Sequence, residues 1–248
     1  MRARLAASER PNRIFEVILE VGRRAGLVGR RRVLDSSPIY DAVATMDTVT
    51  LVRSAIRGLL AAAGELEVEL RAQLGGNDDY ASPGKPVCDY EDPAARQALV
   101  DALAKDARAL LPALDGQPLS DSLRQAAGLL AAVVGQDLEE GEDGVFRIAR
   151  RVAKDRVIST VDPDARHGRK TQAHAFDGYK GHVAVDPDSE IVTATVVTPG
   201  NTGDGAAVAE LLADDLSVTS QHAAAEAGVG AATSSWSQDR PPRPQTNR

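Results

Sequence analysis

The sequence predicts an α/β fold, in which a small sheet is interrupted by a helical segment. Two runs of β-forming residues, 178–185 and 190–197, flank the turn signal DPDS at 186–189 and predict an antiparallel hairpin. Val33 and Leu34 form another short apolar run, and residues 44–145 repeat apolar side chains at helical spacing. Because a hairpin cannot bury its apolar face alone, another part of the chain must complete the sheet.

The composition indicates a soluble protein with room for one or two domains. The chain has 248 residues, of which 43% are hydrophobic and 26% charged. No apolar run approaches the roughly 20 residues that span a bilayer. The basic first residues lead into no apolar segment, so we expect no signal peptide. The single cysteine, Cys88, excludes an internal disulfide and a CxxC metal site. We therefore expect a cytoplasmic protein that does not contact a membrane.

The charge is unevenly distributed along the chain. The net charge of −7 argues against a generally basic nucleic-acid binder, yet arginines crowd residues 1–32 and basic residues recur in 147–156. Acidic residues lie mainly between 65 and 143. This segregation is compatible with a basic surface that meets phosphate. On charge alone, solvated helix faces are the favoured explanation.

The elements before and after the helical segment follow from periodicity. Residues 12–28 predict an amphipathic helix whose apolar face carries Ile14, Val17, Ile18 and Val21. The short strand after it is expected to end at Asp35, which is where α/β proteins place ligands and metals. Alternatively, Asp35 caps a turn. Residues 206–216 predict a further amphipathic helix.

The central part of the chain predicts several helices and shows no catalytic pattern. Helices are expected over 47–63, 65–74, 93–112 and 119–138, with an exposed loop at 75–93. Residues 146–158 read as a helix that passes into an extended segment. From Ser217 the apolar periodicity ends, so residues 217–248 are expected to be a disordered tail. A natural tail and a frameshifted one are both possible, and we favour the frameshift.

Basic and histidine residues gather around the predicted hairpin. The spacing of His167, His174 and His182 matches no common zinc signature. Such groups suit phosphate contact better than metal binding, and Tyr179 could stack or donate a hydrogen bond. Alternatively, they are the polar face of a half-exposed strand. The candidate DNA-binding residues are Arg166, His167, Arg169, Lys170, Tyr179, Lys180 and His182.

Carboxylates are the remaining candidates for chemistry, because the sequence has no P-loop and no GxSxG motif. Asp35, Asp186, Asp204 and Asp41 could hold Mg²⁺, the usual tool for phosphodiester chemistry. Such a mechanism needs at least three acids that converge from different strands.

Four motifs together resemble the insertion-sequence DDE transposases of bacteria, and are most similar to the subgroup with a helical insertion after the first strand. They are VLDSSPIYDAV at 33–43, HGRKT at 167–171, GYKGH at 178–182 and VTPGN at 197–201. The resemblance covers residues 10–216. It implies an incomplete RNase H-like domain of three strands plus a helix, with an inserted all-helical subdomain. The implied divisions are an N-terminal helix remnant at 1–30, the first strand at 31–43, the helical insertion at 44–146, the remaining RNase H-like domain at 147–216 and the tail at 217–248.

The resemblance also implies a site and an activity. Asp35 matches the first catalytic aspartate, a ligand of Mg²⁺, and Asp204 matches a positional residue that could alternatively be a second metal ligand. The later catalytic aspartate and glutamate of the family have no counterpart here. The implied function is a transposase that cleaves and joins DNA strands at insertion-sequence ends, as a possible homo-oligomer. Since one acid cannot hold the metals, we expect an inactive fragment, truncated at both ends. The alternatives are a non-catalytic DNA-binding fragment and a non-functional pseudogene product.

Overall fold

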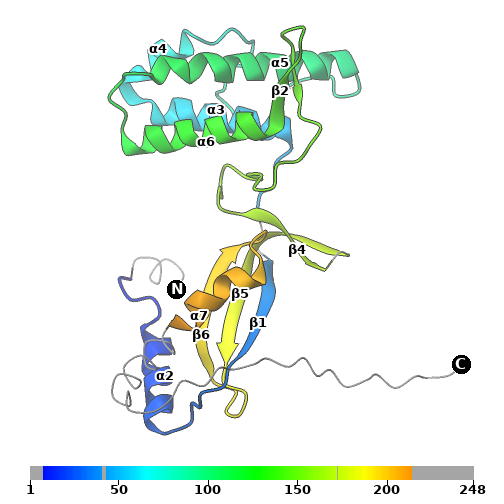
Figure 1. Cartoon of the computed structure of the whole chain (residues 1–248). Coiled ribbons are helices and arrows are strands. Elements are labelled where there is room, and N and C mark those ends of the chain that lie inside the picture. Colours follow the sequence, from blue (N-terminus) through cyan, green and yellow to red (C-terminus); the bar gives the residue numbers. More distant parts are fainter. Residues whose placement is uncertain (1–7, 41–42, 172, 214–248) are drawn as a thin grey trace, which may run out of the picture. The chain divides into compact units, whose positions relative to one another are not determined.

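The computed structural model describes residues 8–40, 43–171 and 173–213 of an α/β chain (Figure 1). The chain divides into two compact units, residues 1–211 and 212–248. Nearly all of the second unit lies outside the described residues, and so does the predicted tail at 217–248 with its frameshift. Within the described part of the chain, no helix is long and apolar enough to cross a membrane.

A four-stranded antiparallel sheet is built around one long central strand. Its strands are β1 (Val33–Tyr40), β4 (Arg166–Thr171), β5 (His174–Val185) and β6 (Val192–Pro199). β1 and β6 pair with the second half of β5, whereas β4 pairs with its first half. The predicted hairpin is confirmed as β5 and β6, and the strand that carries Asp35 lies directly beside it.

One face of the sheet is partly covered by the short helical segment that follows β6. In β5 the side chains alternate, and those of Phe176, Lys180, His182 and Ala184 are buried. Ala184 packs with Ala207 and Leu211 from η3 (Asp204–Ala207) and α7 (Val208–Leu211). This small apolar cluster places Asp204, the first residue of η3, next to the sheet.

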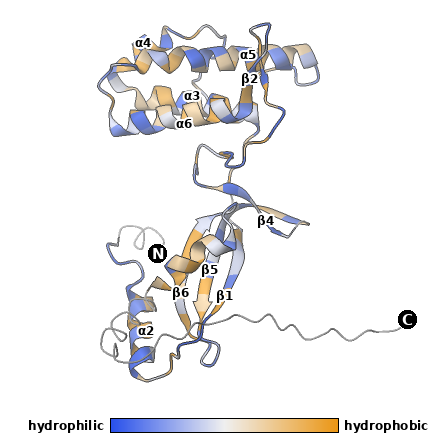
Figure 2. Ribbon diagram, viewed as in Figure 1, coloured by the Kyte–Doolittle hydropathy of each residue, from blue (hydrophilic) through white to orange (hydrophobic). Residues whose placement is uncertain are grey.

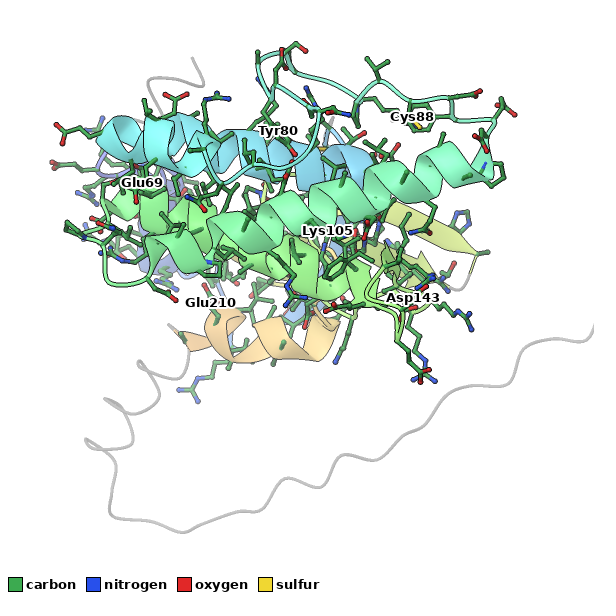
Figure 3. All side chains as sticks on the ribbon, turned by 90° about the horizontal axis from the view of Figure 1, so that it is seen from above. Glu69, Tyr80, Cys88, Lys105, Asp143 and Glu210 are labelled. Atoms are coloured by element: carbon green, nitrogen blue, oxygen red, sulfur yellow. The ribbon has the colours of Figure 1, made fainter. Side chains whose placement is uncertain are left out.

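The segment between β1 and β4 contains a helical bundle with its own core. Its elements are α3 (Thr48–Ala62), η1 (Gly64–Leu66), α4 (Glu67–Arg71), α5 (Pro93–Leu110), η2 (Pro112–Leu114) and α6 (Asp121–Asp137). The side chains of Asp47, Asp92 and Ser120 cap the first turns of α3, α5 and α6. Apolar residues recur along these helices (Figure 2) and pack around the fully buried Ile56, Leu59 and Leu130. The loop residue Tyr80 joins this core (Figure 3).

The prediction of a helix over residues 146–158 was wrong, and the insertion is therefore not all-helical. β2 (Leu138–Glu140) and β3 (Phe146–Ile148) form a short antiparallel hairpin instead. The backbone of Phe146 is hydrogen-bonded to α5, since its N–H donates to Asp101 (2.9 Å) and its carbonyl accepts from Gln97 (2.5 Å). These tertiary contacts hold the segment extended and override its helical pattern.

The expected end of β1 was also wrong. The strand does not stop at Asp35 but continues through Ser36, Ser37 and Pro38 to Tyr40, in register with β5. Asp35 is thus its third residue and does not cap a turn. Pairing with eight consecutive residues of β5 outweighs the local turn signal SSP.

The predicted N-terminal helix exists as α2 (Arg13–Arg24), but its buried face differs from the expected one. Leu19 and Gly22 are buried, and a Cβ at Gly22 would lie 3.3 Å from Ile191 Cδ1. The four residues of the expected apolar face are each more than half exposed. They are Ile14, Val17, Ile18 and Val21. Because Gly22 has no side chain, α2 can lie close to Ile191 at this position.

Candidate functional site

A shallow polar pocket brings together residues from β1, β4, β5 and η3. Its lining consists of Asp35, Ser36, Ser37, Pro38, Lys170, Lys180 and Asp204. The pairing of β1 with β5 sets Ser36 opposite His182 and Pro38 opposite Lys180. This register places the residues of β1 that line the pocket next to Lys180. Two carboxylates and two ammonium groups therefore share one small site.

Lys180 and Asp204 form the best-defined contact in the pocket. The Nζ of Lys180 donates to the carbonyl of Thr202 (2.9 Å) and to Oδ1 of Asp204 (3.0 Å). The Lys180 side chain is only 11% exposed, whereas that of Asp204 is 62% exposed. The ammonium of Lys180, followed by a hydrogen bond from Ser36, holds the pKa of Asp204 below its usual value. Asp204 is therefore ionised and already partnered by a cation.

Asp35 lies at the outer edge of β1. It is exposed and stands opposite Val183, while its neighbours Leu34 and Ser36 stand opposite Ala184 and His182 on the covered face. Oδ1 of Asp35 accepts from the backbone N–H of Ser36 (2.8 Å), and the carbonyl of Ser36 accepts from Nζ of Lys170 (3.3 Å). The side chains of Asp35 and Lys170 thus provide the hydrogen-bond partners of the backbone N–H and carbonyl of Ser36.

These residues do not fit the Mg²⁺ site that the sequence implies. Across the described ranges, no three His, Cys, Asp or Glu side chains gather closely enough to hold a metal ion. Asp35 and Asp204 both line the pocket, but Asp204 is bonded to the ammonium of Lys180. A hard dication needs several free oxygen ligands, and a fixed ammonium on one of them opposes its binding.

Asp186, another carboxylate candidate from the sequence, has a structural role. Its side chain is fully buried and accepts hydrogen bonds from the backbone N–H groups of Gly29 (2.6 Å), Asp188 (3.0 Å) and Ser189 (2.9 Å). The N–H of Ser189, and then those of Gly29 and Asp188, lower the pKa of Asp186 to about 2. Asp186 thus closes the β5–β6 turn and fastens the segment before β1 to it. The remaining candidate, Asp41, lies outside the described residues.

The basic residues predicted to contact DNA divide into two groups. Those on β4 are at or near the surface: His167, Arg169 and Lys170 are exposed, and Arg166 is half-buried. Nδ1 of His167 lies 2.5 Å from Oδ1 of Asp177 on β5. Arg166 donates to the carbonyls of Pro163 (2.5 Å) and Ala165 (2.9 Å). β4 and the first half of β5 thus form a two-stranded ribbon with a basic surface.

The candidates on β5 are turned inward or engaged. His182 is 2% exposed and its Nε2 lies 2.9 Å from Oγ1 of Thr198. The hydroxyl of Tyr179 donates to Oδ1 of Asp162 (2.5 Å). Burial, and then this bond, raises the pKa of Tyr179 to about 12. Tyr179, Lys180 and His182 thus each have a partner within the protein, and their contact with DNA remains a prediction.

Sequence reasoning missed the strand β4 and the partners that the structure gives to these residues. These partners are Asp177 beside His167, Thr202 beside Lys180 and Ser36 beside Lys170, and nothing in the sequence pairs them. The alternation of basic residues in HGRKT was the only available signal for β4, and Gly168 weakens it. A Cβ at Gly168 would lie 2.4 Å from the carbonyl oxygen of Gly200, so close packing explains the glycine.

Comparison with known proteins finds a similarity for part of the chain. Residues 148–229 match the model of the transposase DDE domain. The matched range is less than half of the chain and includes β4, β5, β6 and α7. No curated protein and no solved structure matched the chain. Residues 148–229 are thus similar to the transposase DDE domain, in agreement with the resemblance that the motifs of this region predicted.

Proposed function

We propose that this chain is a transposase-derived DNA-binding protein that contacts phosphates through β4 and does not itself cleave or join strands. The observation that carries the proposal is the ribbon of residues 166–178. It bears the cations Arg166, Arg169 and Lys170 against the single carboxylate of Asp177. Because residues 148–229 are similar to a transposase domain, DNA is the ligand that we propose for this ribbon. A two-stranded β-ribbon is one of the elements that fits the grooves of duplex DNA.

The proposal includes an RNase H-like arrangement for the sheet. β1, β5 and β6 would be the first three strands, α7 would begin the first helix, and the bundle between β1 and β4 would be an insertion. The antiparallel order with β5 between β1 and β6 supports this assignment. The edge of β1 that faces away from β5 has no strand partner among the described residues.

The carboxylates of the pocket are too few to support strand transfer. In-line transfer by two metal ions requires several convergent carboxylates. Here the carboxylates of the pocket are Asp35 and Asp204, and Lys180 is bonded to the second. In the intact family, cleavage would depend on the aspartate that Asp35 matches. Nicking of labelled insertion-sequence ends by the wild type with Mg²⁺ or Mn²⁺, lost on Asp35→Asn, would contradict the non-catalytic assignment.

The DNA-binding proposal predicts a specific salt dependence. Each neutralised phosphate contributes about 0.9 to the slope of log affinity against log salt, so three cations give a slope near 2.7. Between 50 and 200 mM salt, affinity for a duplex should fall about 40-fold for the wild type. For Arg169→Gln/Lys170→Gln it should fall only about 4-fold. Fluorescence anisotropy with a labelled duplex measures both slopes.

A matched control separates the ribbon from general charge. Lys105 and Arg124 are exposed on α5 and α6, with side chains 58% and 62% exposed. Lys105→Gln/Arg124→Gln removes the same net charge from the helical bundle and should leave the slope unchanged. Equal slopes for both double variants would show that the ribbon is not the contact surface, and the proposal would then be abandoned.

A further inference from the structure

Lys180 occupies an unusual position for a cation of the predicted DNA-binding set. Its ammonium is enclosed next to β1 and is held by two oxygens, Thr202 O at 2.9 Å and Asp204 Oδ1 at 3.0 Å. A buried ammonium requires partners of this kind, because desolvation disfavours its charge. The two contacts hold the turn after β6 against β5.

The same ammonium stands where a divalent cation would need to approach. Asp204 is mostly exposed and shares the pocket with Asp35, so water and ions reach its carboxylate. A cation bound to this carboxylate would lie within a few ångströms of Lys180, and like charges at that separation repel. The second lysine of the pocket, Lys170, donates to a backbone carbonyl and not to a carboxylate.

We infer that Lys180 is a positioning residue that acts as a built-in counter-cation. Its ammonium satisfies Asp204 in place of a metal ion and thereby keeps divalent cations out of the pocket beside Asp35. The inference concerns the carboxylate pocket alone and does not depend on DNA binding by β4. It predicts that removal of the ammonium frees the carboxylate of Asp204 and the carbonyl of Thr202 to bind a cation in the pocket that Asp35 also lines.

The test is titration of the full chain with Mn²⁺, followed by electron paramagnetic resonance of the free ion. Lys180→Met keeps the aliphatic stem and removes the charge, and should bind Mn²⁺ about tenfold more tightly than the wild type. Lys180→Gln is the second variant, since its amide can still donate to Thr202. Circular dichroism and thermal unfolding identify which of the two variants is folded.

Two further variants make the outcome specific. Asp204→Asn added to Lys180→Met should abolish the gain, because the freed carboxylate is lost. Lys170→Met removes one positive charge from the same pocket without releasing a carboxylate and should give no comparable gain. The inference is overturned if the wild type binds Mn²⁺ as tightly as the Lys180 variants, if neither folded Lys180 variant gains affinity, or if Lys170→Met gains as much.

Discussion

The buried carboxylate of Asp106 fastens the long loop of the helical bundle, and its removal should be strongly destabilising. Asp106 lies on α5 and is 2% exposed. Oδ1 accepts from the backbone N–H groups of Gly75 (2.8 Å) and Gly76 (3.0 Å), and Oδ2 accepts from the hydroxyl of Tyr80 (2.6 Å). Three donors that come from one loop therefore depend on a single side chain.

The magnitude follows from the groups left without a partner. Asp106→Ala leaves the buried hydroxyl of Tyr80 and the part-buried N–H groups of Gly75 and Gly76 without their partner. The buried hydroxyl costs about 1–3 kcal/mol and the two amides, which water can reach, cost less, so the free energy of unfolding should fall by about 2 kcal/mol or more. Tyr80→Phe removes only one of the bonds and should cost about 1.5 kcal/mol, the lower end for a hydrogen bond to a charged group. Because the two residues are in direct contact, the cycle with Asp106→Asn should show a coupling energy of about 1 kcal/mol.

Urea unfolding at neutral pH, followed by circular dichroism, measures these free energies. The control is Tyr90→Phe in the same loop, where the lost bond is the one that the hydroxyl donates to the backbone carbonyl of Pro86 (2.6 Å). This neutral, part-buried bond should be worth less than the bond from Tyr80 to Asp106. If Tyr80→Phe costs no more than Tyr90→Phe and the cycle shows no coupling, the argument from buried partners fails.

Three further outcomes follow from the structure. Burial, and then the bond to Asp106, raises the pKa of Tyr80, so its contribution to stability is complete below about pH 10 and is lost above it; Tyr80→Phe should flatten the fall in stability at high pH, measured by urea unfolding. Leu130 is fully buried in the bundle core, so Leu130→Ala should cost about 2–5 kcal/mol, and a cost below 1 kcal/mol measured by the same unfolding would show that the core collapses around the change. The pKa of Asp186 is lowered, so its contribution is complete above about pH 4 and is lost as the pH falls towards 2; Asp186→Asn should lower the melting temperature at pH 7 and have little effect near pH 2.

Elements with strong periodicity or clear turn chemistry could be predicted from the sequence. The hairpin of β5 and β6 follows from β-forming runs around DPDS, and α3 and α5 begin within one residue of their expected starts at 47 and 93. The start of α6 at Asp121 is two residues later than expected. These features depend on neighbours in the chain, which a single sequence contains. The family match likewise falls on the motifs around this hairpin.

Features that depend on distant partners could not be predicted. The backbone of Phe146 is hydrogen-bonded to the side chains of Asp101 and Gln97, and these contacts favour the strand β3 over the expected helix. The buried face of α2 is decided by contact between Gly22 and Ile191, although the stronger apolar stripe lies elsewhere. In each case the local pattern was correct as a preference, and a contact from far along the chain was stronger.

The candidate site shows the same division, and it bears on the function we propose. The sequence predicted Asp35 and Asp204 as carboxylate candidates for a metal and Lys170 and Lys180 as DNA-binding candidates. The residue types alone could not show that Lys180 turns inward to Asp204 while Lys170 stays at the surface. The two lysines therefore differ in their surroundings: the ammonium of Lys180 is bonded to a carboxylate, whereas Lys170 is exposed and its ammonium donates to the carbonyl of Ser36. Lys170 also lines the pocket, so a phosphate held on β4 would lie close to Asp35. The proposed DNA contact would therefore be adjacent to Asp35 without sharing its carboxylate, and the proposed loss of metal chemistry does not require loss of DNA binding.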